Sequence, residues 1–322
     1  MDVIIPVFEG CSMFAVSGMI SMLLNANRCN TANHYTFKVT PVSTSDHLTV
    51  NCSDNLKFTC AKRLSQIVNR PDLILVPGLE KDIVKKLPEF KKLAEWLKFQ
   101  YHQGAIIGGS CTGNFILALT GLLKNKTATT HWQAANCFRK LFPDIILQEN
   151  KIIIDHGNII MSGGTLSFQN LMLYLVDKFQ GREASIALSK FMVVDIPKDS
   201  QSSFAVFKGY KQHKDSQILQ VQQIIETDTQ KKWDIKQLSE LSSLSIRQFN
   251  RRFKNATGIG PAEYVRMMKI ESARHYLEQT ELSFSEIAFK SGYEDIQSFR
   301  KQFQKHVGIT PLKYRKKYTF QL

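Results

Sequence analysis

The chain has 322 residues, 43% of them apolar, which is enough for two domains that each bury a core. Its formal net charge of +14 favours a polyanionic partner such as nucleic acid, or an anionic membrane surface. No apolar run reaches the roughly 18 residues of a membrane-spanning helix, and no secretory signal pattern is visible. The six cysteines show neither a CxxC pair nor zinc-like spacing, so we expect free thiols in a reducing cytoplasm, without metal or cofactor.

Strand-like and helix-like stretches alternate through the first two hundred residues. Apolar runs predict buried strands, and 3.6-residue periodicity predicts helices between them. The strands are expected at 3–8, 35–42, 73–76 and 105–107, and the helices at 13–26, 92–100, 113–123 and 166–179. This alternation predicts an α/β sandwich with a mainly parallel sheet over residues 1–197. A polar stretch at 198–216 reads as a linker to a C-terminal domain at 217–322.

One local pattern in this part is typical of a chemical site. The segment 106–114 places Cys111 between two glycines, after a predicted strand and before a predicted helix. This is the G-x-C-x-G form of a nucleophile elbow, in which the helix start lowers the pKa of a thiol. His131 follows twenty residues later as a candidate partner. Further along, Asp155-His156-Gly157 predicts a hairpin turn.

The last hundred residues contain an internal repeat. When Phe249–Tyr264 is placed over Phe299–Tyr314, six positions are identical at a constant offset of 50 residues. The identical pairs are Phe249 and Phe299, Phe253 and Phe303, Gly258 and Gly308, Ile259 and Ile309, Pro261 and Pro311, and Tyr264 and Tyr314. One structural unit is therefore predicted to occur twice.

Each copy predicts two short helices joined by a tight turn. In the first copy Asp234 and Ser245 are positioned to cap the helices, and Gly258 ends the second one. The second copy starts at Ser283 or Ser285, turns at Gly292 and ends at Gly308. The second helix of each copy is rich in basic and polar residues, which indicates a helix-turn-helix.

A connecting helix and a basic surface complete this picture. Residues 262–277 predict a rod of about 25 Å, which could hold two reading helices about one DNA turn apart. Residues 216–322 contain 18 lysines and arginines against 11 acidic residues, so their net charge is about twice as dense as in the rest of the chain. Duplex DNA is the partner that this pattern predicts.

Residues 216–322 resemble the AraC/XylS regulators. The pieces "LSELSSLSIRQFNRRFKNATGIGPAEYVRMMKIESARHYL" and "SFSEIAFKSGYEDIQSFRKQFQKHVGITPLKYR" carry the similarity. The resemblance implies binding to double-stranded promoter DNA, a homodimer, and a contact with RNA polymerase. It implies reading by Arg247, Gln248, Asn250 and Arg251 of the first motif and by Ile296, Gln297, Arg300 and Lys301 of the second. Ile296 departs from the polar residue often found there and could contact only a thymine methyl group.

Residues 1–195 resemble the PfpI-like, class I glutamine-amidotransferase-like fold, as fused in the GlxA-type regulators. The pieces "DLILVPG", "SCTGNFILALTGLLKNKTATTHW" and "LFPDIIL" carry the similarity. It implies a flavodoxin-like sandwich with a pocket lined by Ala15, Gly78, Cys111, Thr112 and His131. In that superfamily an acid often completes the site, and Ala15 occupies its position here.

Two functions are consistent with these patterns. The first is a cytoplasmic bacterial transcription regulator, found at the nucleoid when bound to DNA, whose N-terminal domain senses a small-molecule effector, dimerises, or both. The second is a cysteine-dependent hydrolase, amidase or glyoxalase-like enzyme that uses Cys111 with His131. The missing acid favours the regulator, because a nucleophile needs an oriented base. For Cys111 the open interpretations are a pocket wall, a redox-sensing thiol and a structural remnant. The patterns do not define the effector, the operator or the direction of regulation.

Overall fold

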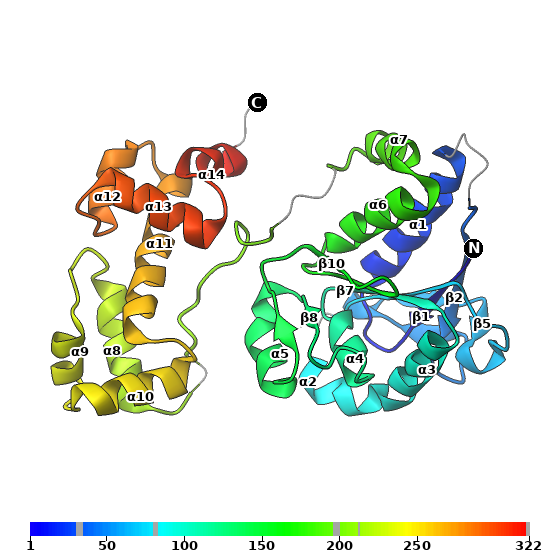
Figure 1. The fold of residues 1–322 in the computed structure, drawn as a ribbon, viewed down its shortest axis with the longest axis horizontal. Helices are drawn as coiled ribbons and strands as arrows, with labels where there is room; N and C mark the ends of the chain where they lie inside the picture. The colour runs from blue at the N-terminus through cyan, green and yellow to red at the C-terminus, as the bar shows by residue number, and fades with distance from the viewer. Residues whose placement is uncertain (30–34, 80–82, 196–199, 212, 320–322) are drawn as a thin grey trace. The chain divides into compact units, whose positions relative to one another are not determined.

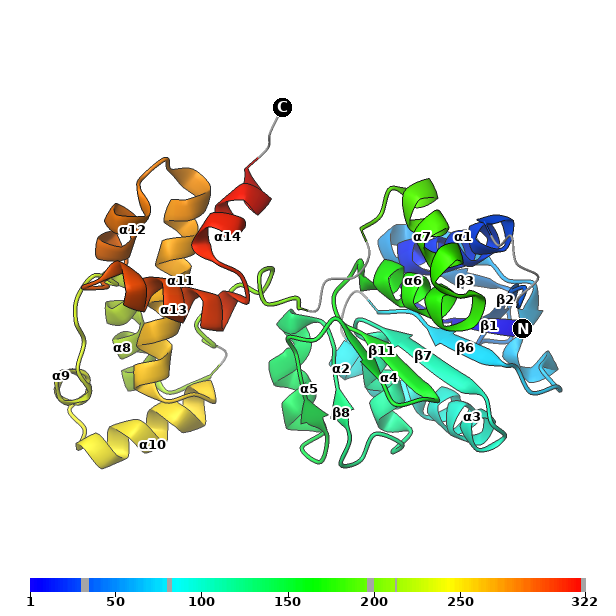
Figure 2. The same cartoon turned by 45° about the horizontal axis from the view of Figure 1, so that its top comes forward.

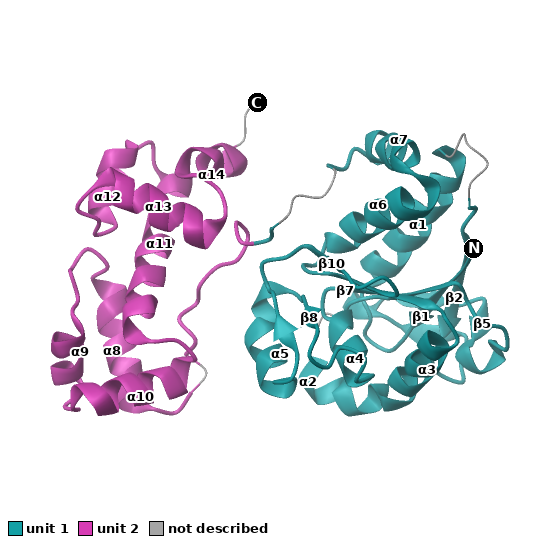
Figure 3. Ribbon diagram, viewed as in Figure 1, with its two compact units in different colours: residues 1–201 teal, residues 202–322 magenta. Residues whose placement is uncertain are grey.

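A computed structural model describes residues 1–29, 35–79, 83–195, 200–211 and 213–319. The chain divides into two compact units, Met1–Gln201 and Ser202–Leu322, which Figure 3 colours separately. The first unit is α/β, and the described part of the second contains helices as its only regular structure (Figure 1). Both predicted fold classes are therefore confirmed. Within the described ranges, no helix is both long and apolar enough to cross a membrane.

The first unit is built on a seven-stranded sheet. Its order from edge to edge is β10 (Ile153–Asp155), β11 (Ile159–Ser162), β7 (Ile106–Ser110), β6 (Leu73–Val76), β1 (Asp2–Val7), β2 (Lys38–Ser43) and β5 (Lys62–Arg63). All neighbouring strands are parallel except β10 and β11, which form the predicted hairpin. The chain adds strands on one side of β1 and then on the other, so the order reverses between β1 and β6. Such a reversal leaves room for a ligand at the carboxyl ends of the strands.

Helices cover both faces of this sheet, as Figures 1 and 2 show. One face carries α1 (Met13–Cys29), α6 (Ser167–Gln180) and α7 (Arg182–Met192), and the other carries α3 (Lys91–His102) and α4 (Gly113–Leu119). The remaining α-helices and strands of this unit are α2 (Ile83–Lys86), α5 (Ala135–Leu141), the hairpin of β3 (Thr49–Asn51) with β4 (Lys57–Thr59), and the parallel pair of β8 (Thr127–Ala128) with β9 (Ile146–Leu147). Burial on both faces explains why the central strands read as continuous apolar runs.

Several predicted element ends shift by one to four residues, and two of these shifts have a visible cause. The strand predicted at 35–42 begins only at Lys38, because the Asn27 side chain bonds the backbone N–H and C=O of Phe37, both at 2.8 Å. The helix predicted to reach residue 123 ends at Leu119, where Gly121 adopts a φ of +77°. At the first end a side chain takes the backbone hydrogen bonds that would extend the strand. At the second end a residue with a left-handed φ stops the helix.

The second unit contains seven helices in its described part. They are α8 (Ser216–Thr227), α9 (Ile235–Leu241), α10 (Ile246–Thr257), α11 (Pro261–Gln279), α12 (Phe284–Lys290), α13 (Ile296–Val307) and α14 (Pro311–Tyr318). Asp234, Ser245 and Ser283 cap α9, α10 and α12 through capping boxes. Gly258 and Gly308 end α10 and α13 with the same φ of +81°. The predicted caps are confirmed, and Ser283 rather than Ser285 starts the second copy.

The repeat is longer than the sequence comparison indicated. The Tyr264 hydroxyl donates to Glu226 of α8 at 2.7 Å, and the Tyr314 hydroxyl donates to Glu278 of α11 at 2.5 Å. Each bond closes a separate apolar core, one around Phe249 and Phe253 and the other around Phe299 and Phe303. Helix α11 is therefore more than the predicted connector, because it also begins the second copy as α8 begins the first.

The segment 202–211 packs as part of the second unit, although it falls within the linker expected at 198–216. Phe207 is buried in the first of the two cores, and Arg274 of α11 donates to the Ser202 carbonyl at 3.0 Å and to the Ala205 carbonyl. Gln201 belongs to the first unit, where its side chain donates to the Thr130 carbonyl at 2.9 Å. The chain passes from one unit to the other between two anchored residues.

Candidate ligand cavity and DNA-binding surface

Cys111 lies in a sharp turn between β7 and α4. Its φ of +56° is in the left-handed region, which is rare for a residue with a side chain. The Cys111 N–H donates to the Ser162 carbonyl at 2.8 Å, and Gly113 approaches so closely that a Cβ there would come within 2.5 Å of the Pro77 carbonyl oxygen. The predicted elbow geometry is confirmed. Strain of this kind is characteristic of functional turns.

A cavity of about 520 Å³ opens beside this turn. Its walls come from loops that follow β1, β6 and β7 and from the segment after β8. They contain all five residues predicted for the pocket, which are Ala15, Gly78, Cys111, Thr112 and His131. The volume lies within the range of small-molecule sites. The structure brings these residues together, and their contact with a ligand remains a prediction.

Sequence reasoning missed several polar residues of the wall. Ser12, Ser110, Gln133 and Thr165 also line the cavity. The Ser110 hydroxyl is buried and has no hydrogen-bond partner among the described residues. Its position directly before Cys111 was the available signal. An unpaired buried hydroxyl at a cavity wall is a group that a ligand could satisfy.

His131 is not arranged as a base in this structure. Its Nδ1 accepts a hydrogen bond from the Gln133 N–H at 3.1 Å, and burial lowers the pKa of the imidazole. A neutral imidazole with Nδ1 as acceptor carries its proton on Nε2. In this tautomer the Nε2 edge of the ring is a hydrogen-bond donor.

The position of the missing acid is confirmed as apolar. Ala15 is buried in the first turn of α1 and lines the cavity. Glu9, the nearest acid in sequence, accepts a hydrogen bond from the Asn51 N–H at 3.2 Å. Among the described residues, His, Cys, Asp and Glu form no group of three that could hold a metal. Position 15 thus gives the cavity wall a methyl group in place of a carboxylate.

The second helices of the two motifs present most of their predicted reading residues outward. In α10, Phe249 and Phe253 are fully buried, whereas Arg247, Gln248 and Arg251 are exposed. In α13, Phe299 and Phe303 are buried in the same way, and Gln297, Arg300 and Lys301 are exposed. Two cation-bearing helix faces are thus open to a polyanion.

Three of the predicted reading residues have other contacts. The Gln248 side chain accepts from the Ser245 N–H at 3.2 Å as part of a capping box, and the Asn250 side chain donates to the Ile246 carbonyl at 2.9 Å. Ile296 is half-buried against the core of the second motif. Roles in base reading remain predictions for all eight residues.

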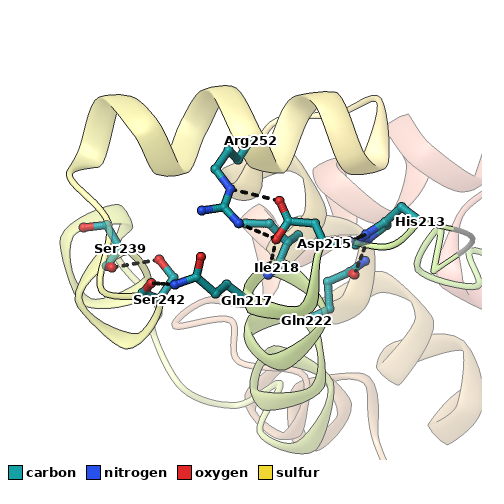
Figure 4. A network of polar contacts seen from close by, with 8 residues as sticks. All are labelled: His213, Asp215, Gln217, Ile218, Gln222, Ser239, Ser242 and Arg252. Carbon is teal, nitrogen blue, oxygen red and sulfur yellow. Dashed lines mark hydrogen bonds and ion pairs between the residues drawn. The ribbon is translucent and has the colours of Figure 1, made fainter.

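A polar network positions the first reading helix (Figure 4). Arg252 of α10 holds Asp215 with two hydrogen bonds of 2.9 and 2.8 Å, and the same carboxylate caps α8. This bond is the main reason why the pKa of Asp215 lies below its ordinary value. Gln217 of α8 also donates to the Ser242 carbonyl, in the turn between α9 and α10, at 2.9 Å. Sequence reasoning missed this network, for which the only signal was the capping position of Asp215.

Comparison with known proteins agrees with this division into an α/β unit with an elbow and a helical unit with two motifs. The model of the DJ-1/PfpI family matches residues 2–178, and a helix-turn-helix domain model matches residues 238–317. The chain belongs to the DJ-1/PfpI family and carries a helix-turn-helix domain behind it. Both resemblances stated from the sequence are confirmed.

The similar curated proteins are named as transcriptional regulators. The chain is 26% identical over 235 residues to the HTH-type transcriptional regulator GbdR of Pseudomonas aeruginosa, covering 73% of this chain and 62% of that protein. It is 27% identical over 217 residues to the regulator GlxA of Rhizobium meliloti, covering 66% of each chain. The matched region thus spans less than two thirds of these relatives' length.

Solved structures share the fold of the first unit. A putative transcriptional regulator from Vibrio parahaemolyticus superposes with a TM-score of 0.54 at 20% identity, over 60% of this chain and 98% of that one. DJ-1beta of Drosophila melanogaster gives a TM-score of 0.51 at 18% identity, also over 60% and 98% of the two chains. Identities this low establish the fold alone.

Proposed function

We propose that the protein is a sequence-specific DNA-binding transcription regulator. The observation that carries the proposal is the pair of capped helix-turn-helix motifs whose reading helices bury two phenylalanines each and expose their cations. Arginine pairs bidentately with guanine, asparagine and glutamine with adenine, and lysine suits phosphates. Names of the curated relatives support the same class of protein.

The α/β unit would provide regulation rather than catalysis. A small-molecule effector in the Cys111 cavity would contact the five predicted wall residues and satisfy the unpaired Ser110 hydroxyl. The same unit would form the homodimer, and the helical unit would contact RNA polymerase. As such a regulator, the protein would act in the cytoplasm, at the nucleoid when bound to promoter DNA.

The experiment selects DNA sequences from a random pool with the full chain and then measures affinity for the selected and for scrambled duplexes. We expect an enriched motif with two half-sites and at least a 10³-fold preference over scrambled DNA. Equal affinity for both duplexes would contradict sequence-specific regulation.

The enzyme hypothesis makes a different prediction. Turnover of amide or 2-oxoaldehyde substrates that disappears in Cys111→Ser would support a hydrolase or a glyoxalase-like enzyme. We expect no turnover in the wild-type protein or in Cys111→Ser, because the Nδ1 atom of His131 already accepts a hydrogen bond from the Gln133 N–H and Ala15 replaces the acid. A Cys111-dependent rate would overturn our assignment of this unit.

A further inference from the structure

Two buried thiols face each other outside the cavity. Cys11 follows β1, and Cys52 follows β3 of the small hairpin. Their sulfur atoms are 3.7 Å apart, and both cysteines are free. The residues are 41 positions apart in the chain, so only the fold brings them together.

Backbone bonds hold the two thiols in this arrangement. The Gly10 N–H donates to the Asn51 carbonyl at 2.8 Å, and the Ser53 N–H donates to the Cys11 carbonyl at 2.9 Å. The loop after β1 is thus tied to the hairpin on both sides of the sulfur pair. A disulfide bond is about 2.05 Å long, so its formation needs an approach of roughly 1.6 Å from the observed separation.

The two sulfurs are chemically unequal. The hydrogen bond between them lowers the pKa of the Cys52 thiol and raises that of Cys11. Cys52 is 6% exposed, whereas Cys11 is fully buried. Nearby, burial raises the pKa of Cys60 to about 11, which keeps that thiol protonated. Cys52 is therefore the sulfur that would react first, since the thiolate is the nucleophile.

We propose that Cys11 and Cys52 form a dithiol site that a hydroperoxide, such as hydrogen peroxide, oxidises to a disulfide. The Cys52 thiolate attacks one peroxide oxygen, the O–O bond breaks, and the leaving hydroxide takes up a proton to become water. Cys11 then loses its proton and attacks the sulfur of the Cys52 sulfenic acid, whose S–O bond breaks to release a second water. Two thiols and one peroxide give one disulfide and two waters.

The site adjoins the walls of the cavity. Cys11 pairs with Leu79 in a β-bridge, and the Ser12 N–H donates to the Gly78 carbonyl at 2.8 Å. Ser12, Gly78 and Leu79 all line the cavity. Movement of the Cys11 sulfur toward Cys52 therefore acts on the loop that carries part of this wall.

Peptide mapping of the full chain tests the proposal directly. Cleavage after lysine and arginine separates Cys11 (peptide 1–28), Cys29 (29–38), Cys52 (39–57) and Cys60 (58–62). After brief treatment with hydrogen peroxide, remaining thiols are blocked with N-ethylmaleimide and the digest is analysed with and without reduction. We expect peptides 1–28 and 39–57 to be linked by a bond that reduction breaks.

Single variants assign the two steps. In Cys11→Ala we expect the linked peptide to disappear and dimedone to label Cys52, because the sulfenic acid then has no partner. Cys137→Ala is the matched control, since this half-buried thiol lies outside the pair, and it should leave the linked peptide unchanged. A thermal melt of each variant verifies folding.

Two outcomes would overturn the proposal. One is a link of Cys52 to Cys60 or Cys29 in place of Cys11. The other is that Cys11 and Cys52 stay reduced at a peroxide dose that already oxidises Cys111. In that case N-ethylmaleimide, added after the treated protein is unfolded, would block both thiols completely. Neither result depends on DNA binding.

Discussion

Arg251 and Arg252 are neighbours in α10 and have different surroundings. Arg251 is exposed on the outer face, whereas Arg252 turns toward α8 and holds Asp215 bidentately. Adjacent residues on a helix point about 100° apart, which separates a residue that reads DNA from one that positions the helix. Only the first of these roles is expected to depend on the DNA sequence.

We predict that Arg251→Ala weakens binding to selected DNA by about 1–3 kcal/mol and leaves the free energy of unfolding unchanged. Arg252→Ala should instead lower the free energy of unfolding, because Asp215 loses its bidentate, partly exposed ion pair. Fluorescence anisotropy with the selected duplex and urea denaturation measure the two effects. A stability loss in Arg251→Ala equal to that in Arg252→Ala would contradict this division.

Glu271 of α11 is a buried acid with a pH-dependent contribution to stability. Burial raises the pKa of its carboxyl to about 7, although Arg274 is 3.5 Å away. The folded state therefore binds this proton more tightly than the unfolded state. The resulting stability is fully present below the ordinary carboxyl pKa and is lost as the pH rises through about 7.

We predict that Glu271→Gln removes this loss, since the amide stays neutral. As the pH rises from 4.5 to 8, the free energy of unfolding of the variant should increase by about 2–3 kcal/mol relative to that of the wild type. Urea denaturation of both proteins at several pH values measures the difference, and other titrating groups cancel in the comparison. A difference independent of pH would show that folding does not shift the pKa of Glu271.

At the scale of elements, the two helix-turn-helix motifs pack against each other through a glycine. Gly292, in the turn between α12 and α13, has a φ of +77°. A Cβ at this position would lie 2.7 Å from the Thr229 carbonyl oxygen and 2.9 Å from that of Gln230, both in the loop between α8 and α9. The turn of the second motif thus rests on the backbone of the first copy. Gly258 has a similar φ of +81° with nothing within 4 Å.

We predict that Gly258→Ala costs about 1 kcal/mol of stability, which is the strain of a left-handed alanine. Gly292→Ala should cost at least twice as much, because the added methyl group also displaces backbone atoms. Gly292→Ala should also weaken binding to a duplex with two half-sites more than it weakens binding to a duplex with one half-site. Equal losses in the two variants would mean that the contact between the copies is loose.

At the scale of the whole molecule, positive charge is concentrated in the helical unit. Residues 216–322 carry 18 basic and 11 acidic residues, and those predicted to read DNA are mostly exposed. Each phosphate contact releases counterions from DNA. The logarithm of the binding constant therefore falls linearly with the logarithm of the salt concentration, and the salt slope of this line grows with the number of phosphate contacts. Charge placed elsewhere on the chain should contribute little to this slope.

We predict that Lys301→Ala reduces the salt slope by about 1 and weakens binding to selected and scrambled duplexes alike. Lys98→Ala is the matched control, because this exposed lysine lies on α3 of the α/β unit and carries the same charge. Titrations at four salt concentrations give the slopes. If wild type and Lys301→Ala had the same salt slope, Lys301 would not contact a phosphate.

The sequence by itself determined the features that depend on local geometry. Helix periodicity, the caps at Asp234 and Ser245, the left-handed glycines 258 and 308 and the elbow at Cys111 all follow from backbone preferences within a few residues. The repeat at an offset of 50 residues predicted two equivalent motifs, because the same buried phenylalanines are needed to close each one.

Only the tertiary structure decided which distant residues meet. The double role of α11, the bond between Asp215 and Arg252, and the sulfur pair of Cys11 and Cys52 join residues 36 to 41 positions apart. Strand order likewise placed Ser12, Ser110 and Thr165 around one cavity. Local sequence patterns do not predict such contacts. The contacts arise when whole elements pack around a shared core, and no single segment's preferences determine them.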